Sequence, residues 1–96
     1  MKETIDVTIE RSGEQVFLVF NFENVLKMNL TSNNQEEMKI FFQKLIAKLF
    51  NDYTSSEKEY ALNFKDCDGS DLFHDVAEKY VSSLNSEIQS IYSRMN

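Results

Sequence analysis

Apolar and polar residues alternate along the first part of the chain in the pattern typical of β-strands. The segments Thr4–Arg11 and Gln15–Phe22 both show this alternation, and both are rich in β-branched or aromatic residues. Between them, Ser12-Gly13 predicts a tight turn, because glycine readily adopts positive φ. A two-residue turn at that point predicts three apolar pairs on one face of a hairpin: Ile9 with Val16, Val7 with Leu18, and Ile5 with Phe20.

A third strand is predicted within residues 25–31, V-L-K-M-N-L-T, where apolar residues again take alternate positions. A three-residue loop over residues 23–25 places Leu26 opposite Phe22 and continues the apolar face of the hairpin. Val25 fits this loop poorly, because β-branched residues avoid the left-handed conformation that such loops often use.

Two further segments repeat apolar residues every three or four positions, which predicts amphipathic helices. The first begins at residues 32–34, and its apolar stripe continues to about Phe50. Two capping boxes fit its start: Ser32 with Gln35, and Asn33 with Glu36. The second helix is predicted to run from about Asp71 toward Arg94.

Between the helices, the polar segment N-D-Y-T-S-S-E (51–57) predicts a connection. The segment Glu59–Lys65 then alternates again and predicts a fourth strand, with Tyr60, Leu62 and Phe64 directed inward. The resulting order is β-β-β-α-β-α over a single domain, residues 1–96. We therefore predict an α+β two-layer sandwich, in which a mostly antiparallel four-stranded sheet carries two helices on one face.

The second strand also carries apolar residues on the face that the helices leave open. Phe17 and Val19 point to that side, and their expected neighbours are polar or charged: Asp6, Thr8, Lys27 and Asn29. An apolar centre within a polar rim is the arrangement of many protein-binding surfaces. We therefore predict that Phe17 and Val19 contact a partner.

Composition favours a folded cytoplasmic domain. Apolar residues make up 42% of the 96 residues, which is enough for one hydrophobic core. No apolar run approaches the roughly 20 residues of a membrane span, and the first residues, M-K-E-T-I-D, lack the apolar stretch of a signal peptide. The single cysteine, Cys67, excludes an internal disulfide and suits a reducing compartment.

The formal net charge is −6, and the acidic surplus is concentrated in one region. No cluster of Lys or Arg occurs, which disfavours direct binding to nucleic acid or to an anionic membrane. We predict instead a protein partner with a basic surface. The acidic residues expected to contact it are Asp52, Glu57, Glu59, Asp66, Asp68, Asp71, Asp75 and Glu78.

The segment D-C-D-G-S-D-L-F-H-D-V-A-E (66–78) holds the only histidine and the only cysteine of the chain. It is not an EF-hand loop, because Gly69 as sixth residue would put Phe64 at the first ligand position. One helix face does offer a set of transition-metal ligands at i, i+3, i+4 and i+7: Asp71, His74, Asp75 and Glu78. Because acidic residues also stabilise the positive end of a helix dipole, we favour a helix start capped at residue 70 or 71, without a metal.

Catalytic chemistry is not indicated. Cys67 and His74 would be the nucleophile and base, but the surrounding carboxylates disfavour a thiolate and no third residue is apparent. The chain also lacks a phosphate loop, a dinucleotide motif, a nucleophile elbow and a zinc-binding motif. We predict that the protein is not an enzyme and needs no cofactor.

The last predicted helix is longer than the strands require. About 24 residues span roughly 36 Å, whereas a strand of average length spans about 20 Å. Its final turns should therefore pass the sheet, either as a frayed terminus or as a contact with another chain. The candidate dimer or partner seam consists of Ile88, Ile91, Tyr92 and Met95.

Three functional hypotheses follow. The first is a small acidic protein-binding module that inhibits a nucleic-acid-handling protein stoichiometrically, as immunity proteins or phage anti-defence proteins such as anti-CRISPRs do. That association rests on size and charge. The second is an acidic homodimeric chaperone or assembly factor that holds a client on the open sheet face. The third is a metal-dependent enzyme built on Asp71, His74 and Glu78.

Overall fold

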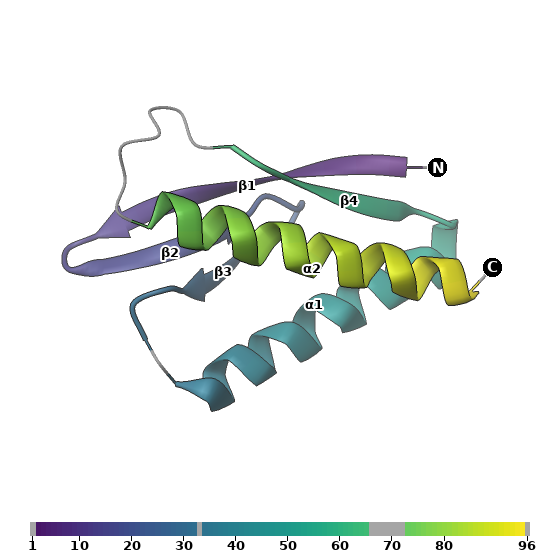
Figure 1. The fold of residues 1–96 in the computed structure, drawn as a ribbon. Helices are drawn as coiled ribbons and strands as arrows, with labels where there is room; N and C mark the ends of the chain where they lie inside the picture. Colours follow the sequence, from purple (N-terminus) through teal and green to yellow (C-terminus); the bar gives the residue numbers. More distant parts are fainter. Residues whose placement is uncertain (1, 33, 66–72, 96) are drawn as a thin grey trace.

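The computed structural model describes residues 2–32, 34–65 and 73–95. Four strands and two helices follow one another in the predicted order, β-β-β-α-β-α, and confirm the α+β class. Their bounds are β1 Lys2–Ser12, β2 Gln15–Phe20, β3 Leu26–Asn29, α1 Gln35–Ser56, β4 Glu59–Phe64 and α2 His74–Met95. Figure 1 shows both helices on one side of the sheet, far apart where α1 begins and close together where it ends.

The strands form one sheet in the order β3-β2-β1-β4. The β1–β2 and β2–β3 pairs are antiparallel, and the β1–β4 pair is parallel. A parallel partner for β1 cannot follow from a tight turn, so the chain crosses from the β3 edge to the β4 edge through α1. The sheet thus has two outer strands, β3 and β4.

The predicted register of the first hairpin is wrong by two residues, although the predicted face is right. Ile9 lies opposite Leu18 rather than Val16, and Val7 lies opposite Phe20. The turn is formed by Gly13 and Glu14, with Gly13 at φ 61°, which is the first position of a turn that requires glycine. A shift of two positions leaves every side chain on its own face, so alternation alone does not detect it.

The loop before β3 is longer than predicted, and this register is also shifted by two. Leu26 lies opposite Phe20 instead of Phe22. The strand β2 ends at Phe20 because the chain turns there, with the Phe22 amide donating to the Phe20 carbonyl at 3.0 Å. Phe22 is thereby released from the sheet and packs edge-on against Tyr60, with ring centroids 5.2 Å apart.

Helix α1 begins at the last residue of the predicted range, 32–34, and ends later than predicted. Its N-cap is Asn34 rather than the predicted Ser32, and the Asn34 Oδ1 accepts hydrogen bonds from the Glu36 and Glu37 amides at 3.0 and 3.3 Å. The other predicted capping residue, Asn33, lies outside the described residues. The helix continues past Phe50 to Ser56, through the segment predicted as a connection. Tyr53 explains the extension, because its ring packs on that of Tyr92 at 5.7 Å and is thus part of the helical packing.

The core lies between the sheet and the two helices and contains the inward residues of all four strands. Helix α2 begins at His74 within the described residues, and the predicted start at Asp71 lies outside them. Neither helix, over the part of the chain described, is apolar enough along its length to cross a membrane. The most deeply buried large side chains are Phe20, Leu18, Leu45, Ile88, Val7 and Val16.

Candidate functional site: the open edge of the sheet

Side chains of α2 cap the outer edge of β4. The Lys65 amide donates to the Val7 carbonyl, so the odd-numbered residues of β4 bond to β1 and the even-numbered ones face outward. Three polar side chains meet these outward groups: the Tyr92 hydroxyl accepts from Tyr60 N at 3.1 Å, Asn85 Oδ1 accepts from Leu62 N at 2.8 Å, and Gln89 Nε2 donates to Tyr60 O at 2.8 Å. This edge cannot readily accept another strand.

The outer edge of β3 has no such caps. The Leu30 amide donates to the Val16 carbonyl at 2.7 Å, so the even-numbered residues of β3 bond to β2. The backbone N–H and C=O groups of Lys27 and Asn29 therefore point outward. Among the described residues, no side chain or backbone group bonds to them. Unpaired edge groups of this kind are the template on which a further strand can add.

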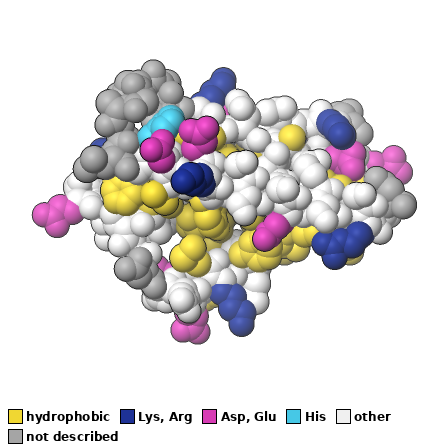
Figure 2. Space-filling model, viewed as in Figure 1, with side chains coloured by type: hydrophobic (Ala, Val, Ile, Leu, Met, Phe, Trp, Pro, Cys, Tyr) yellow, Lys and Arg dark blue, Asp and Glu magenta, His cyan; other side chains and the backbone are white. Residues whose placement is uncertain are grey.

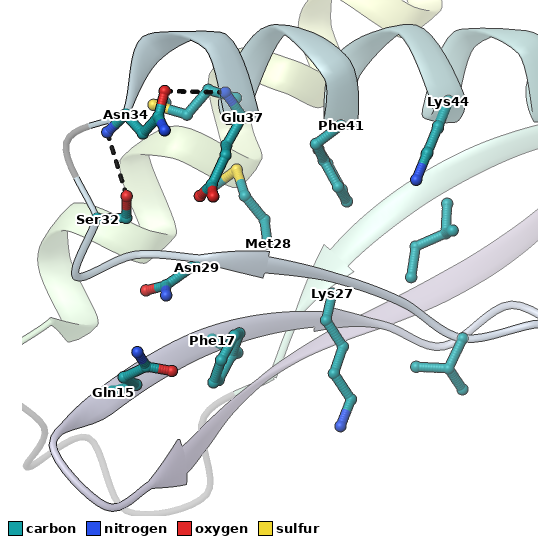
Figure 3. Close-up of a pocket in the computed structure, with 13 residues that line it drawn as sticks. Gln15, Phe17, Lys27, Met28, Asn29, Ser32, Asn34, Glu37, Phe41 and Lys44 are labelled. Carbon is teal, nitrogen blue, oxygen red and sulfur yellow. Dashed lines mark hydrogen bonds between the residues drawn. The ribbon is translucent and has the colours of Figure 1, made fainter.

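A groove of about 440 Å³ runs along this edge, between β3 and the first half of α1. We call it the β3–α1 groove. In Figure 3, Met28 points from β3 toward α1, Phe41 and Lys44 point from α1 toward the strands, and Lys27 points to the other side of the sheet. Val25, at one end of the groove, is 50% exposed. The groove therefore offers apolar contacts beside the free backbone of β3.

Two of the predicted partner-binding residues lie near this groove. Phe17 lines it and is half-buried. Val19 lies on the same open face, as predicted, but only 7% of it is exposed. The ion pair between Lys27 and Glu10, 2.7 Å apart, joins β3 to β1 across β2. Of the two, Phe17 is the residue with surface to offer a partner.

The predicted acidic surface is not continuous over the described residues. Glu57 and Glu59 lie near the start of β4, whereas Asp75 and Glu78 lie in the first turns of α2, which follows the end of β4. The six residues of β4 separate the two groups by roughly 17–20 Å. Glu59 shares the open sheet face with Phe17, but it pairs with Lys2 at one end of β1, whereas Phe17 pairs with Glu10 near the other end. Asp66, Asp68 and Asp71 lie outside the described residues.

Asp52, the first residue predicted in that acidic surface, is engaged inside the protein. Its Oδ2 accepts a 2.5 Å hydrogen bond from the Tyr60 hydroxyl and lies 2.9 Å from Lys48 Nζ. The Tyr60 hydrogen bond, followed by the Lys48 contacts, holds the pKa of Asp52 below its ordinary value of 3.8. Desolvation and the neighbouring Asp52 charge raise the pKa of Tyr60. Asp52 thus anchors the start of β4 to the end of α1.

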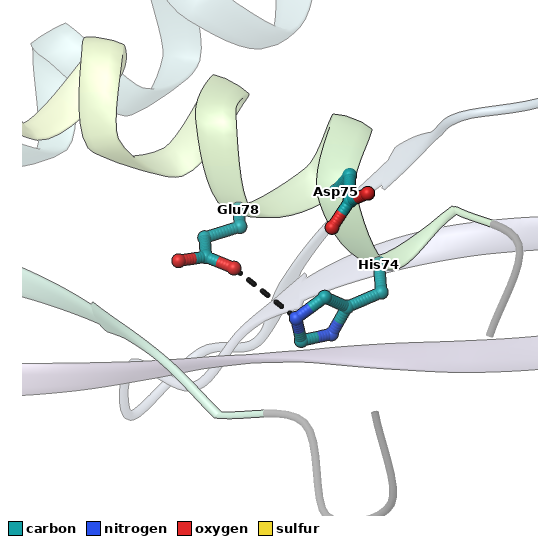
Figure 4. Close-up of side chains that lie close together, drawn as sticks. All are labelled: His74, Asp75 and Glu78. Carbon is teal, nitrogen blue, oxygen red and sulfur yellow. Dashed lines mark ion pairs between the residues drawn. The ribbon is translucent and has the colours of Figure 1, made fainter. Parts of the chain in front are cut away.

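The histidine of the chain takes part in a small polar cluster at the start of α2. His74 Nε2 lies 3.1 Å from Glu78 Oε2, and one ligand atom each of His74, Asp75 and Glu78 lie within 4.8 Å of one another (Figure 4). The His74 ring also packs 5.5 Å from Phe64. The cluster sits at the positive end of the α2 dipole, which disfavours a cation. The fourth predicted ligand, Asp71, and the predicted nucleophile, Cys67, lie outside the described residues.

The predicted seam at the end of α2 is only partly on the surface. Ile88 and Tyr92 are 1% and 3% exposed and belong to the core, where the Tyr92 hydroxyl also reaches the Tyr60 amide of β4. Ile91 and Met95 are half-buried and adjoin Ile46 and Phe50 of α1 across a small cavity of about 30 Å³. Those two residues alone can contribute surface to an interface.

Comparison with protein-family models, with curated proteins and with solved structures finds no match for this chain.

Proposed function

We propose that this protein is a protein-binding module that holds an extended segment of its partner against β3. This proposal rests on the difference in backbone hydrogen bonding between the two outer strands of the sheet. Three α2 side chains bond the outward backbone of β4, whereas the outward groups of Lys27 and Asn29 have no partner among the described residues. Strand addition satisfies such groups and is a recurring mode of peptide recognition.

The lining of the groove defines the chemistry of the bound segment. An added strand directs alternate side chains toward α1, where the half-buried Leu26 and Met38 offer apolar contacts. The charges along the groove balance, because Glu37 offsets Lys44 and Lys27 is paired with Glu10. The segment is therefore an uncharged β-strand former with apolar residues at every second position. Binding is stoichiometric and involves no chemical step.

Selection of peptides from a displayed random library tests this proposal. The protein and its Lys27→Ala and Lys27→Pro variants are used as baits. Both variants lose the ion pair to Glu10, but only proline removes the outward N–H at position 27. We expect alternating apolar peptides that bind the wild-type protein and Lys27→Ala, and that bind Lys27→Pro at least roughly tenfold more weakly. Equal binding to the two variants would contradict strand addition at β3.

The acidic surplus favours a basic protein as the source of that segment. Four lysines form ion pairs within the protein: Lys27 with Glu10, Lys48 with Asp52, Lys58 with Glu3, and Lys65 with Asp6. Asp75 and Glu78 remain exposed next to the acidic segment of the sequence. Their field would attract a nucleic-acid-handling protein and compete with its phosphate ligand, as a stoichiometric inhibitor does.

Affinity capture from the lysate of the source organism, after nuclease treatment, tests whether the partner is a basic protein. A basic partner attracted by the acidic residues is retained at low salt and released at high salt. Charge reversal at Asp75 and Glu78 together should weaken its capture, whereas reversal at the exposed loop residue Glu23 should not. Capture of a partner that is insensitive both to salt and to these reversals would contradict the proposal of a basic partner. It would not contradict strand addition at β3.

A further inference from the structure

The β3–α1 groove has two ends of opposite charge. Helix α1 runs in the opposite direction to β3, because Phe41 packs at 5.1 Å on Phe20, which pairs with the first residue of β3. Figure 3 shows Glu37 directed toward β3 at the end of the groove where Asn29 lies, and Lys44 at the other end. Seven helical residues separate these two charged side chains by about 10.5 Å along α1.

The end of the groove beside Asn29 is closed. The next outward N–H group of the strand, that of Thr31, donates to the Asn29 side chain, whose Oδ1 accepts it at 2.9 Å. The same oxygen accepts from the Thr31 hydroxyl at 2.6 Å. Ser32 and Asn34, on the way from β3 to α1, line the groove at this end. A strand added along β3 therefore begins or ends opposite Asn29.

A carboxylate stands at this closed end. Glu37 is exposed, and its side chain makes no ion pair or hydrogen bond with the rest of the described chain. The amides of Glu36 and Glu37 donate to Asn34 Oδ1, so these N–H groups of α1 are already satisfied. The two carboxylates in the first turn also outweigh the roughly half positive charge of a helix N-terminus. This end of the groove therefore attracts a cation and repels an anion.

We infer that the segment bound along β3 is the free amino terminus of the partner, running antiparallel to β3. This inference rests on the strand addition proposed above. In this direction the first residue of the segment lies opposite Asn29, whose carbonyl accepts from the terminal ammonium group and whose amide donates to the first carbonyl of the segment. A second hydrogen of the ammonium group donates to the Glu37 carboxylate, which is a charge-assisted hydrogen bond.

The other arrangements of a bound segment are less favourable. A parallel strand that ended opposite Asn29 would bring its carboxylate beside Glu37. A parallel strand that began in the groove would place its ammonium group on the side of Lys44. An internal segment would leave Glu37 without a partner and would have to turn away where the chain passes from β3 to α1.

Antiparallel pairing also assigns the side chains of the segment to the two faces of the sheet. Residues directly opposite each other share a face, so the second and fourth residues lie beside Met28 and Leu26 and point toward α1. Figure 2 shows hydrophobic side chains gathered between the two helices on that side of the sheet. The second and fourth residues are therefore the apolar ones. Because the side chains of the segment are uncharged, the charge that Glu37 meets is that of the chain terminus.

Two synthetic libraries of short random peptides test the inference, identical except that the amino termini of one library are acetylated. Both are immobilised through their carboxyl ends, and the protein is passed over them. We expect the protein to be retained by peptides with a free amino terminus and with apolar second and fourth residues. Acetylation removes the terminal charge, so it should weaken the binding of these peptides at least roughly tenfold.

Glu37→Gln tests the contact from the side of the protein, with Glu36→Gln as its control. Both variants lose one acidic side chain from the first turn of α1, but only Glu37 lines the groove. We expect Glu37→Gln to weaken the binding of peptides with a free amino terminus roughly tenfold, and Glu36→Gln to leave it unchanged.

Two results would overturn the inference: acetylated peptides that bind as tightly as free ones, or equal losses in Glu37→Gln and Glu36→Gln. If Lys27→Pro still binds these peptides more weakly than Lys27→Ala does, only the assignment of the amino terminus is wrong and strand addition stands. Equal binding of the peptides by Lys27→Pro and Lys27→Ala would contradict strand addition itself.

Discussion

The two outer strands of the sheet differ in how the protein treats their free backbone groups. Along β4, the side chains of Asn85, Gln89 and Tyr92 take up outward N–H and C=O groups. Along β3, among the residues described, the corresponding groups of Lys27 and Asn29 meet no protein partner. The difference shows that this fold can close an edge with three polar residues on a helix, and that it closes only one.

The positions of the helices explain the difference. Helix α2 runs beside β4 closely enough for side chains one turn apart to reach its backbone. Helix α1 stands off from β3 and leaves the β3–α1 groove between them. Two features limit unwanted pairing of other chains with β3: it is only four residues long, and it carries the charge of Lys27. Short length and charged side chains are common protections of edge strands. An edge protected in this way can still pair with a short segment whose side chains fit the groove.

Opening the closed edge should have the largest effect on stability. Asn85→Ala with Tyr92→Phe leaves the Leu62 and Tyr60 amides without their bonds, and the Tyr60 amide bond is buried. We expect the free energy of unfolding, measured in urea, to fall by about 2–4 kcal/mol. Ser82→Ala, an exposed change on α2, is the control. A loss no larger than that of the control would mean that the caps do not close this edge.

The anchor at the start of β4 should respond to acid. The pKa of Asp52 is lowered in the folded protein, so its stabilising effect is complete above the ordinary value of 3.8 and is lost as pH falls through the lower folded value. We expect Asp52→Asn to lose about 1–2 kcal/mol of stability at neutral pH. The stability of the wild-type protein should approach that of the variant in strong acid. A gap that persists unchanged into strong acid would show that the Asp52 charge is not responsible.

The outer edge of β3 should tolerate the loss of a backbone N–H group, whereas the edge that is hydrogen-bonded to β2 should not. Lys27→Pro and Lys27→Ala both lose the ion pair with Glu10, and the proline variant loses an outward N–H in addition. Proline is accepted on an edge strand where that group faces solvent. We expect the free energy of unfolding of Lys27→Pro, measured by thermal denaturation, to lie within about 1 kcal/mol of that of Lys27→Ala. A much larger loss would indicate that the Lys27 amide is already bonded within the protein, so that β3 is not an open edge.

Much of the fold could be predicted from residue alternation, but the pairing of strands could not. Alternation assigns Val7 and Leu18 to the same face, and the structure confirms that face. It repeats every two residues, so a register shifted by two satisfies it equally well. The structure resolves the choice through Gly13, which takes the first position of the turn, and through the chain reversal after Phe20.

The site could be predicted only in part. Phe17 is identifiable because an apolar residue on the polar face of a strand is unusual, and it lines the groove. The groove itself depends on which strand lies at the edge and on where α1 crosses, and neither is encoded in a local pattern. The caps of β4 did have a signal: Asn85, Gln89 and Tyr92 are polar groups at i, i+4 and i+7, on one side of the apolar stripe of α2.

The parallel pairing of β1 with β4 has a consequence for the newly made chain. Lys2 pairs with Glu59, so one edge of β1 stays unpaired until β4 has been synthesised, which happens only after α1. During that interval the meander of β1, β2 and β3 exposes its apolar face, and closing so long a loop is slow. We expect chains released before β4 to aggregate, and the ribosome-bound intermediate to be the stage at which this protein most needs a chaperone.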